Sequence, residues 1–231
     1  MAGILYAIPT PLGGTVADAL PVSALETVKT LRYFVVENAK SARAFLKAAG
    51  SDPKEMQIQE LNETSDLQSL LKPLKEGNSL GLLSEAGCPA IADPGALLVE
   101  AAQREGIRVV PLVGPSSIVL ALMASGLEGQ RFAFCGYLPR NAEERSRRIK
   151  ELETRSRKEK ETQIFIETPY RNDAMLASLL ESCAPQTQLC IATDLTLQSE
   201  SVRTHRIGEW RSLGCRIGKQ PTVFLLLSVN R

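Results

Sequence analysis

The segment from Ser84 to Gly95 has residue types that suit a loop holding a ligand. It reads Ser-Glu-Ala-Gly-Cys-Pro-Ala-Ile-Ala-Asp-Pro-Gly and directly follows a short apolar run. Glycine lets a backbone approach a ligand closely, and proline stiffens the loop around it. The small side chains leave room for a flat group to press on the main chain. Spacing alone is equally compatible with a rigid connector that binds nothing.

Two common phosphate-binding fingerprints are absent from this chain. The loop has no Gly-Lys-Ser/Thr sequence, which a Walker-type phosphate loop requires. The first apolar run is followed by Thr10-Pro11-Leu12-Gly13-Gly14, where a dinucleotide-binding fold would show Gly-x-Gly-x-x-Gly. A ligand of Ser84–Gly95 is therefore expected to be held in another way.

Few residues of this chain are candidates for metal ligands or catalytic nucleophiles. The five cysteines show no metal-ligand spacing such as Cys-x-x-Cys, and they are expected to be reduced thiols in a cytoplasmic protein. The only histidine, His205, lies in a run that predicts an exposed strand, so we interpret it as incidental to catalysis. We predict no metal site.

The first half of the chain predicts a mostly parallel sheet with helices on both faces. Short apolar runs alternate there with amphipathic stretches. In such sheets, ligands bind beyond the carboxyl ends of the strands. The loops after Ile8, Val36, Leu83 and Leu112 should therefore share one edge. The expected strands are 4–8, 33–36, 56–61, 79–83 and 108–112, and the expected helices are 21–30, 39–49, 64–76 (with Pro73 kinking or restarting it), 96–105 and 117–124.

The second half predicts a mixed sheet and a second domain. We expect strands at 132–135, 162–166, 189–193, 202–207 and 223–228, with little helix between the last three, and helices at 142–160 and 172–183. Residues 136–141 are expected to be a connector. We place the domains at 1–113 and 114–231.

Composition narrows the class of protein. With a formal net charge of +1, the chain has no overall positive charge to attract nucleic acid, so any such contact needs a local basic patch. No apolar run approaches the ~20 residues that a membrane span needs. The apolar start lacks a basic region before it and is interrupted by Pro9 and Pro11, so it is not expected to be a secretory signal. We expect a soluble cytoplasmic protein that does not contact membranes.

Several motifs together resemble the tetrapyrrole methylase family. The resemblance runs from about Leu5 to about Arg171 in good order and spacing. Two of the motifs point further, to the branch that methylates the ribose 2′-hydroxyl of a cytidine in small-subunit ribosomal RNA. The motifs are Thr10-Pro11-Leu12-Gly13, Ser84–Gly95, Gly114-Pro115-Ser116-Ser117 and Ser125-Gly126-Leu127, with Phe134–Pro139 and Glu167-Thr168-Pro169-Tyr170-Arg171 carrying the branch.

This resemblance implies S-adenosylmethionine as methyl donor and a fold of two α/β domains with the cofactor in the cleft between them. It also implies a homodimer. Small side chains and backbone groups would hold the cofactor without competing charge. Carried over by position, the cofactor contacts are Pro11, Ala86, Gly87, Cys88, Ile91, Ser116, Ser117 and Glu167, with Asp194 as a looser match.

The chain departs from the ribosomal branch mainly on the substrate side. The usual Glu-Asp-Thr-Arg is here Glu37-Asn38-Ala39-Lys40, and the usual Ser-Pro-His-Arg is Thr168-Pro169-Tyr170-Arg171. The usual Arg-Glu-Leu-Thr-Lys is Thr193-Asp194-Leu195-Thr196-Leu197, without either basic residue. The methyl acceptor therefore stays open.

An acceptor hydroxyl needs a base or a polarising group, and Glu37 is our candidate. It ends an apolar strand on the ligand edge, although a carboxylate there can equally cap the following helix. Lys40 and Arg171 are candidates to hold a phosphate of the acceptor, or else are solvated surface charges.

The run from Arg140 to Lys160 mixes basic and acidic residues, with the basic ones in excess. That mixture is typical of an exposed helix with internal ion pairs, and it also suits an RNA-backbone contact. Three functions remain: a methyltransferase for ribosomal RNA or the small ribosomal subunit, a methyltransferase for a small molecule such as a tetrapyrrole, and a non-catalytic cofactor-binding protein associated with RNA.

Overall fold

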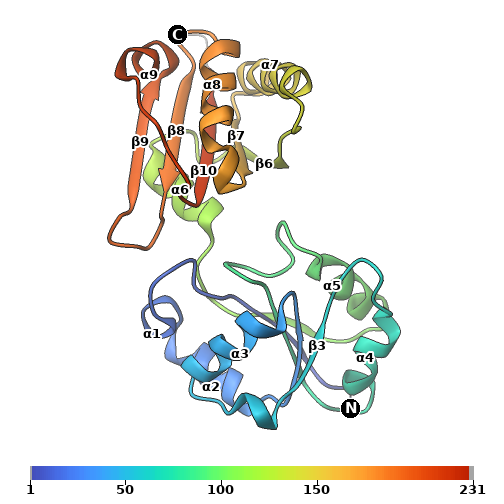
Figure 1. Ribbon diagram of the computed structural model, residues 1–231. Coiled ribbons are helices and arrows are strands. Elements are labelled where there is room, and N and C mark those ends of the chain that lie inside the picture. The colour runs from blue at the N-terminus through green and yellow to red at the C-terminus, as the bar shows by residue number, and fades with distance from the viewer. Residues whose placement is uncertain (1, 229–231) are drawn as a thin grey trace. The chain divides into compact units, whose positions relative to one another are not determined.

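The computed structural model describes residues 2–228 and divides into two compact units, Met1–Ser116 and Ser117–Arg231. Each unit is built on a five-stranded sheet (Figure 1). The division lies a few residues beyond the domain boundary that the sequence suggests at 113/114.

The sheet of the first unit is parallel throughout, in the order β3-β2-β4-β1-β5. Ile8 of β1 and Val36 of β2 both lie opposite Leu83 of β4. The strands therefore end level, and the loops that follow them share one edge, as predicted. The strands are β1 (Leu5–Ile8), β2 (Tyr33–Val36), β3 (Gln57–Glu60), β4 (Leu80–Leu83) and β5 (Val109–Pro111).

Two apolar clusters form the core of this unit. One gathers Phe34, Leu46 and Val28, and the other gathers Val35, Leu71 and Leu98. Because neighbouring strand residues such as Phe34 and Val35 point to opposite faces, the sheet is buried on both sides, as parallel sheets are. The helices are α1 (Val16–Ala19), α2 (Val22–Thr30), α3 (Ala39–Ala48), η1 (Pro53–Glu55), α4 (Leu67–Lys75) and α5 (Gly95–Arg104).

The second unit has a mixed sheet in the order β6-β7-β10-β8-β9. Only the β6–β7 pair is parallel. Trp210, Phe224 and Leu179 are central to its core. Its strands are β6 (Phe132–Tyr137), β7 (Thr162–Glu167), β8 (Gln188–Thr193), β9 (Ser201–Arg206) and β10 (Thr222–Leu227). Its helices are α6 (Ser117–Ser125), α7 (Ala142–Glu159), η2 (Pro169–Arg171), α8 (Asn172–Ser182) and α9 (Ile207–Leu213).

Three local expectations are wrong, and one helix was not expected. Helix α9, of seven residues, follows β9 directly, and Ile207 is its first residue rather than a strand residue. Residues 136 and 137 extend β6 and are not connector. Helix α4 begins only after Asp66, whose carboxylate accepts from Gln68 N at 3.0 Å, and it continues through Pro73. The short helix α1 was not predicted at all.

Within residues 2–228, no helix is both long and apolar enough to cross a membrane.

Candidate functional site

The loop after β4 is fastened to the loop after β1. Thr10 N donates to Gly87 O at 2.9 Å, and Gly87 N donates back to Thr10 O at 3.0 Å. Two buried hydroxyls reinforce the junction: Thr10 Oγ1 donates to Ser84 O at 3.3 Å, and Ser84 Oγ donates to Gly87 O at 3.0 Å. These bonds fix the main chain of the loop at the carboxyl edge of the sheet.

The loop adopts backbone conformations that few residue types accept. Gly87 has φ +80°, and Ala90 and Ala92 have φ +66° and +62°. A left-handed conformation outside glycine has a cost that the surroundings must offset. Asp93 does this locally, because its Oδ1 accepts from Ala90 N at 2.8 Å and from Gly95 N at 2.7 Å. The loop is therefore rigid, which suits both a connector and a preformed ligand site.

The segment after β5 closes against both loops. Cys88 Sγ donates to Pro115 O at 3.4 Å. A side chain at Gly114 would come within 2.4 Å of Pro9 Cβ, and one at Gly87 would lie 3.2 Å from Leu12 Cδ2. The glycines thus allow three loops to touch, and they leave main-chain groups accessible where a side chain would otherwise stand.

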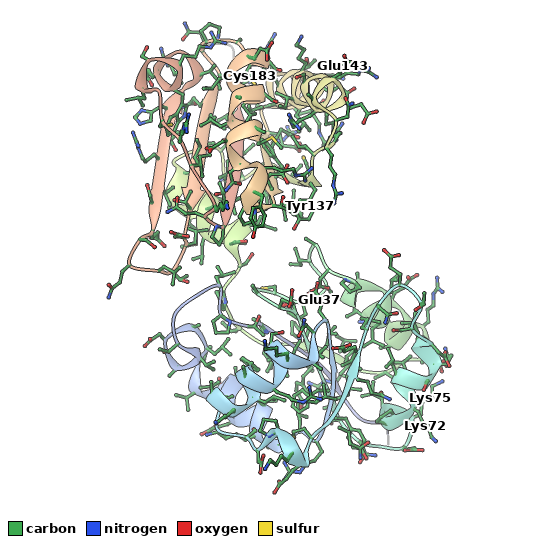
Figure 2. All side chains as sticks on the ribbon, in the orientation of Figure 1. Glu37, Lys72, Lys75, Tyr137, Glu143 and Cys183 are labelled. Atoms are coloured by element: carbon green, nitrogen blue, oxygen red, sulfur yellow. The ribbon has the colours of Figure 1, made fainter. Side chains whose placement is uncertain are left out.

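Glu37 joins the same edge from the end of β2 (Figure 2). Its Oε2 accepts from Glu85 N at 3.2 Å. Desolvation raises the pKa of the Glu37 carboxyl; the bond from Glu85 N opposes this, and the negative charges of Glu85 and Asp93 add to it. Glu37 does not cap helix α3, because Asn38 does so through Oδ1 to Lys40 N and Ser41 N. Lys40 is exposed in the first turn of that helix.

A small cavity of about 200 Å³ opens beside these loops. Its walls come from the loops after β1 and β4 and from one face of α3. Pro11, Phe45 and Glu85 are among its lining residues, and alanine and serine side chains make up much of the rest.

The second unit holds a buried ion pair at the end of β7. Glu167 is 5% exposed, and its Oε1 pairs with Arg171 Nη2 and accepts from Thr168 N at 2.6 Å. Arg171 Nε also donates to Thr168 Oγ1 at 3.2 Å. Two buried atoms of the pair lack a partner among residues 2–228: Glu167 Oε2 and Arg171 Nη1. Such atoms are costly to leave unsatisfied, so they are expected to meet a ligand.

Asp194 lies on the same edge of this sheet. Thr222, the first residue of β10, is opposite both Glu167 on β7 and Thr193 on β8. Asp194 follows β8 with φ +51°, and its Oδ2 accepts from Gln220 Nε2 at 2.9 Å. The fully buried Asn172 donates through Nδ2 to Gln220 O at 2.7 Å and to Thr222 Oγ1 at 3.1 Å.

The predicted site residues therefore fall into two groups, one in each unit. In the first unit, Glu37 bonds to the loop that holds Ala86, Gly87, Cys88 and Ile91, and the loops that hold Pro11 and Ser116 bond to that loop as well. Glu167, Arg171 and Asp194 share the edge of the second sheet, and Ser117 begins α6. Their roles in binding or catalysis remain predictions.

Sequence reasoning missed three polar residues that build these edges: Thr10, Asn172 and Gln220. Thr10 stands in a quoted motif, so its place there was a usable signal. Asn172 and Gln220 carry no local signal, because their bonds join segments almost fifty residues apart.

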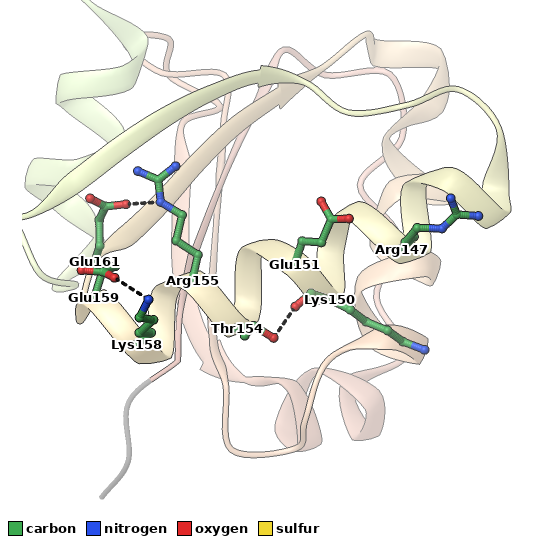
Figure 3. Close-up of a pocket in the computed structure, with 8 residues that line it drawn as sticks. All are labelled: Arg147, Lys150, Glu151, Thr154, Arg155, Lys158, Glu159 and Glu161. Carbon is green, nitrogen blue, oxygen red and sulfur yellow. Dashed lines mark hydrogen bonds and ion pairs between the residues drawn. The ribbon is translucent and has the colours of Figure 1, made fainter.

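The charged helix α7 forms a shallow groove of its own, of about 740 Å³ (Figure 3). Several cations of the helix are paired with carboxylates. Arg155 Nε lies 3.0 Å from Glu161 Oε1, and Arg148 Nη1 lies 3.0 Å from Glu151 Oε2. This is the ion-paired helix that the charge pattern predicted; an RNA contact there stays a prediction.

Metal chemistry has no candidate in residues 2–228, where no cluster of His, Cys, Asp and Glu could hold an ion. His205 lies on the edge strand β9 with its ring 4.8 Å from that of Trp210. Trp210 is buried and donates to Leu189 O at 2.9 Å, so it is a core residue.

Comparisons with known proteins agree on one family. Residues 5–210 match the family described as Tetrapyrrole (Corrin/Porphyrin) Methylases. The chain is 33% identical over 208 residues to "Ribosomal RNA small subunit methyltransferase I" of Vibrio cholerae, a match that covers 90% of this chain and 70% of that protein. It is 33% identical over 207 residues to the protein of the same name from Escherichia coli O157:H7, with the same coverage.

Solved structures share the fold at lower identity. The methyltransferase CobJ superposes with a TM-score of 0.65 at 15% identity, covering 99% of this chain and 95% of that one. The uroporphyrin-III-C-methyltransferase from Thermus thermophilus superposes with a TM-score of 0.59 at 20% identity, covering 99% and 93%. These likenesses concern the fold.

Proposed function

Because the chain belongs to the tetrapyrrole methylase family of S-adenosylmethionine-dependent methyltransferases, we propose that it methylates a ribose 2′-hydroxyl in small-subunit ribosomal RNA. The observation that supports this choice of acceptor is the 33% identity, over 90% of the chain, to enzymes named for that subunit. The choice of a ribose hydroxyl rests on the resemblance of two motifs, which end in Leu138-Pro139 and Tyr170-Arg171, to those of the ribosomal branch.

The loop residues fit the proposed cofactor. Gly87 and Gly114 keep side chains away from the junction of three loops, so backbone N–H and C=O groups near Ala86 and Ser116 are the natural contacts. In the second unit, the unpartnered Glu167 Oε2 can accept from a hydroxyl or amino group of the cofactor. S-adenosylmethionine supplies an activated methyl group when bound, so the protein has mainly to align the acceptor and exclude water.

Glu37 is the proposed general base. Its carboxylate ends β2 at the ligand edge, and its raised pKa makes it a stronger proton acceptor than an ordinary glutamate while it is ionised. The bond from Glu85 N orients the carboxylate. Lys40 and Arg171 are proposed to lie near the phosphates that flank the acceptor, although Arg171 has only Nη1 left for such a contact.

The charges at this edge weigh against a tetrapyrrole acceptor. Glu37, Glu85 and Asp93 lie close enough for the negative charges of the other two to raise the pKa of Glu37. An acceptor bearing several carboxylates near its reacting centre would be repelled there, whereas a ribose hydroxyl is uncharged.

The test is transfer of labelled methyl from S-adenosylmethionine to 30S subunits that lack the modification. We expect label in the RNA with the wild-type protein and a loss of at least about 100-fold in rate with Glu37→Gln, the scale of general-base catalysis. Glu26→Gln, an exposed acid on α2, is the matched control and should keep the wild-type rate.

Label that enters a tetrapyrrole but no RNA would establish the small-molecule function instead. Binding of S-adenosylmethionine and 30S subunits without transfer to either acceptor would establish a non-catalytic RNA-associated protein. Absence of heat on titration with S-adenosylmethionine would refute the proposed cofactor.

We also propose that the enzyme works as a homodimer in the cytoplasm. The resemblance supports the dimer, and five free cysteines suit a reducing compartment. Light scattering after size exclusion measures the mass directly, and a monomer at micromolar concentration would contradict the first part.

A further inference from the structure

An exposed aromatic side chain stands beside the buried ion pair of the second unit. Tyr170, in the short helix η2, is 81% exposed, and the residue that follows it is Arg171 of the pair. Large apolar side chains exposed to this degree mark sites of interaction when they gather with other binding groups. The position belongs to this chain's own pattern, since the ribosomal branch usually has histidine there.

A lysine from a distant segment covers this ring. Lys219 Nζ lies 5.0 Å from the ring centroid of Tyr170, in the geometry of a cation–π contact. Lys219 is exposed and has no carboxylate partner within 4 Å in the part of the chain that the structure describes. Its charge is therefore available to an anion.

Two neighbouring side chains hold the segments of Tyr170 and Lys219 together. Asn172 donates to Gly218 O at 3.1 Å and to Gln220 O at 2.7 Å, on either side of Lys219. Asp173 Oδ1 accepts from Ile217 N at 2.8 Å and from Gly218 N at 3.2 Å. The ring and the ammonium group are thus positioned before any ligand arrives.

The carboxylate of Asp173, which bonds the segment just before Lys219, is already engaged. The bonds from Ile217 N and Gly218 N lower the pKa of Asp173, with a further contribution from the charge of Arg216. Asp173 stays ionised at neutral pH, but its charge faces these N–H groups and Arg216. What the surface offers outward is the Tyr170 ring and the Lys219 ammonium group.

We propose that Tyr170 and Lys219 form a platform on which an unpaired base of the acceptor RNA stacks, while Lys219 contacts a backbone phosphate. Single-stranded RNA is recognised by bases stacking on aromatic side chains, with cations following the phosphates. The platform adjoins Glu167 and Arg171, so it would hold a nucleotide next to the proposed cofactor contacts. This inference rests on the proposed function for its choice of RNA.

The experiment measures binding and methylation of unmodified 30S subunits by variants of the full chain. Tyr170→Ala should weaken 30S binding by about tenfold and raise KM to match, with kcat within about twofold, since stacking on one aromatic side chain is worth that order of affinity. Tyr170→Phe retains the ring and should bind like wild type. Phe132→Ala, an exposed aromatic at the opposite end of the same sheet, is the control.

Salt dependence tests the lysine separately. Lys219→Gln should lower the slope of log binding constant against log salt by about 0.7, the value for one phosphate contact on a single strand. Lys54→Gln, which changes an exposed lysine of η1 in the first unit, is the control and should leave the slope unchanged. Binding of S-adenosylmethionine and the melting temperature should be unaffected in all these variants.

Equal 30S binding by Tyr170→Ala and Phe132→Ala, or an unchanged slope for Lys219→Gln, would overturn the platform. Because binding is read without turnover, it judges the platform even if the wild-type protein transfers no methyl group to RNA. That last result would refute only the proposed function, whereas absence of any 30S binding by wild type would refute both.

Discussion

The ionised form of Glu37, which the proposed catalysis needs, is the form that lowers the stability of the folded protein. Because desolvation raises its pKa, the ionised form that a general base requires is disfavoured in the folded protein. By linkage, the stability that protonated Glu37 contributes is present at low pH and is lost as the pH rises through the titration range of the carboxyl. At neutral pH the ionised side chain therefore costs some stability.

The first prediction concerns Glu37→Gln. We expect its melting temperature at pH 7 to equal or slightly exceed that of wild type while methyl transfer collapses. The wild-type rate should fall on the acid side at a pH above the ordinary range for glutamate, and the residual rate of the variant should lack that limb. A variant that melts clearly lower, or keeps the acid limb, would contradict this account.

The second prediction concerns Glu167. Glu167→Gln keeps the shape but removes the charge that pairs with Arg171, so we expect a loss of about 1–3 kcal/mol in unfolding free energy. Affinity for S-adenosylmethionine should fall about tenfold if Oε2 accepts a bond from it. Denaturant unfolding and calorimetry measure the two effects. Glu181→Gln, exposed on α8, should change neither.

Among the elements, β4 tolerates no added side chain at its second residue. An ideal Cβ at Gly81 would lie 2.7 Å from the Phe34 ring and 2.8 Å from Ile8 Cδ1. These atoms belong to the neighbouring strands β2 and β1, so the glycine sets how closely the core packs on the middle of the sheet.

The third prediction follows from that packing. Gly81→Ala should lower the unfolding free energy by about 1–3 kcal/mol through overpacking. Gly129→Ala has nothing within 4 Å of the new Cβ and serves as the control. Equal stability of the two variants would show that Phe34 and Ile8 can move aside at little cost.

Most elements could be predicted from apolar runs and from the glycine and proline residues that separate them. The run Tyr33–Val36 matches strand β2 residue for residue, and the shared edge of the loops followed because parallel strands end level. Helix α9 was missed because seven residues that include a glycine give too short a periodic signal. Its start is fixed instead by the bond from Arg206 N to Glu209 Oε2 at 2.8 Å, and its end by Gly214 at φ +56°.

The candidate sites were only partly predictable. The loops of the first unit carry glycine and proline, which mark them in the sequence. The second edge depends on Asn172, which joins the start of α8 to residues 218–222. It also contains the ion pair of Glu167 with Arg171, which are four residues apart. The bonds of Asn172 span 46 to 50 residues of sequence, so no local pattern encodes them.

At the scale of the whole molecule, each unit has its own sheet and its own apolar core. Separate cores allow separate unfolding. Gly81 lies in the first unit, and the core around Phe224 lies in the second.

The fourth prediction uses this division. Gly81→Ala should move the part of the circular-dichroism transition that belongs to the first unit and leave the rest in place. A single transition that shifts as a whole would show that the two units unfold cooperatively.

Trp210 makes that experiment possible, because the chain has only one tryptophan. Its indole is 2% exposed and hydrogen-bonded inside the second unit, with Arg203 5.2 Å from the ring centroid. Intrinsic fluorescence at its emission band therefore follows the second unit alone. A melting curve recorded only from that fluorescence would rate Gly81→Ala as harmless even where half of the chain had lost its structure.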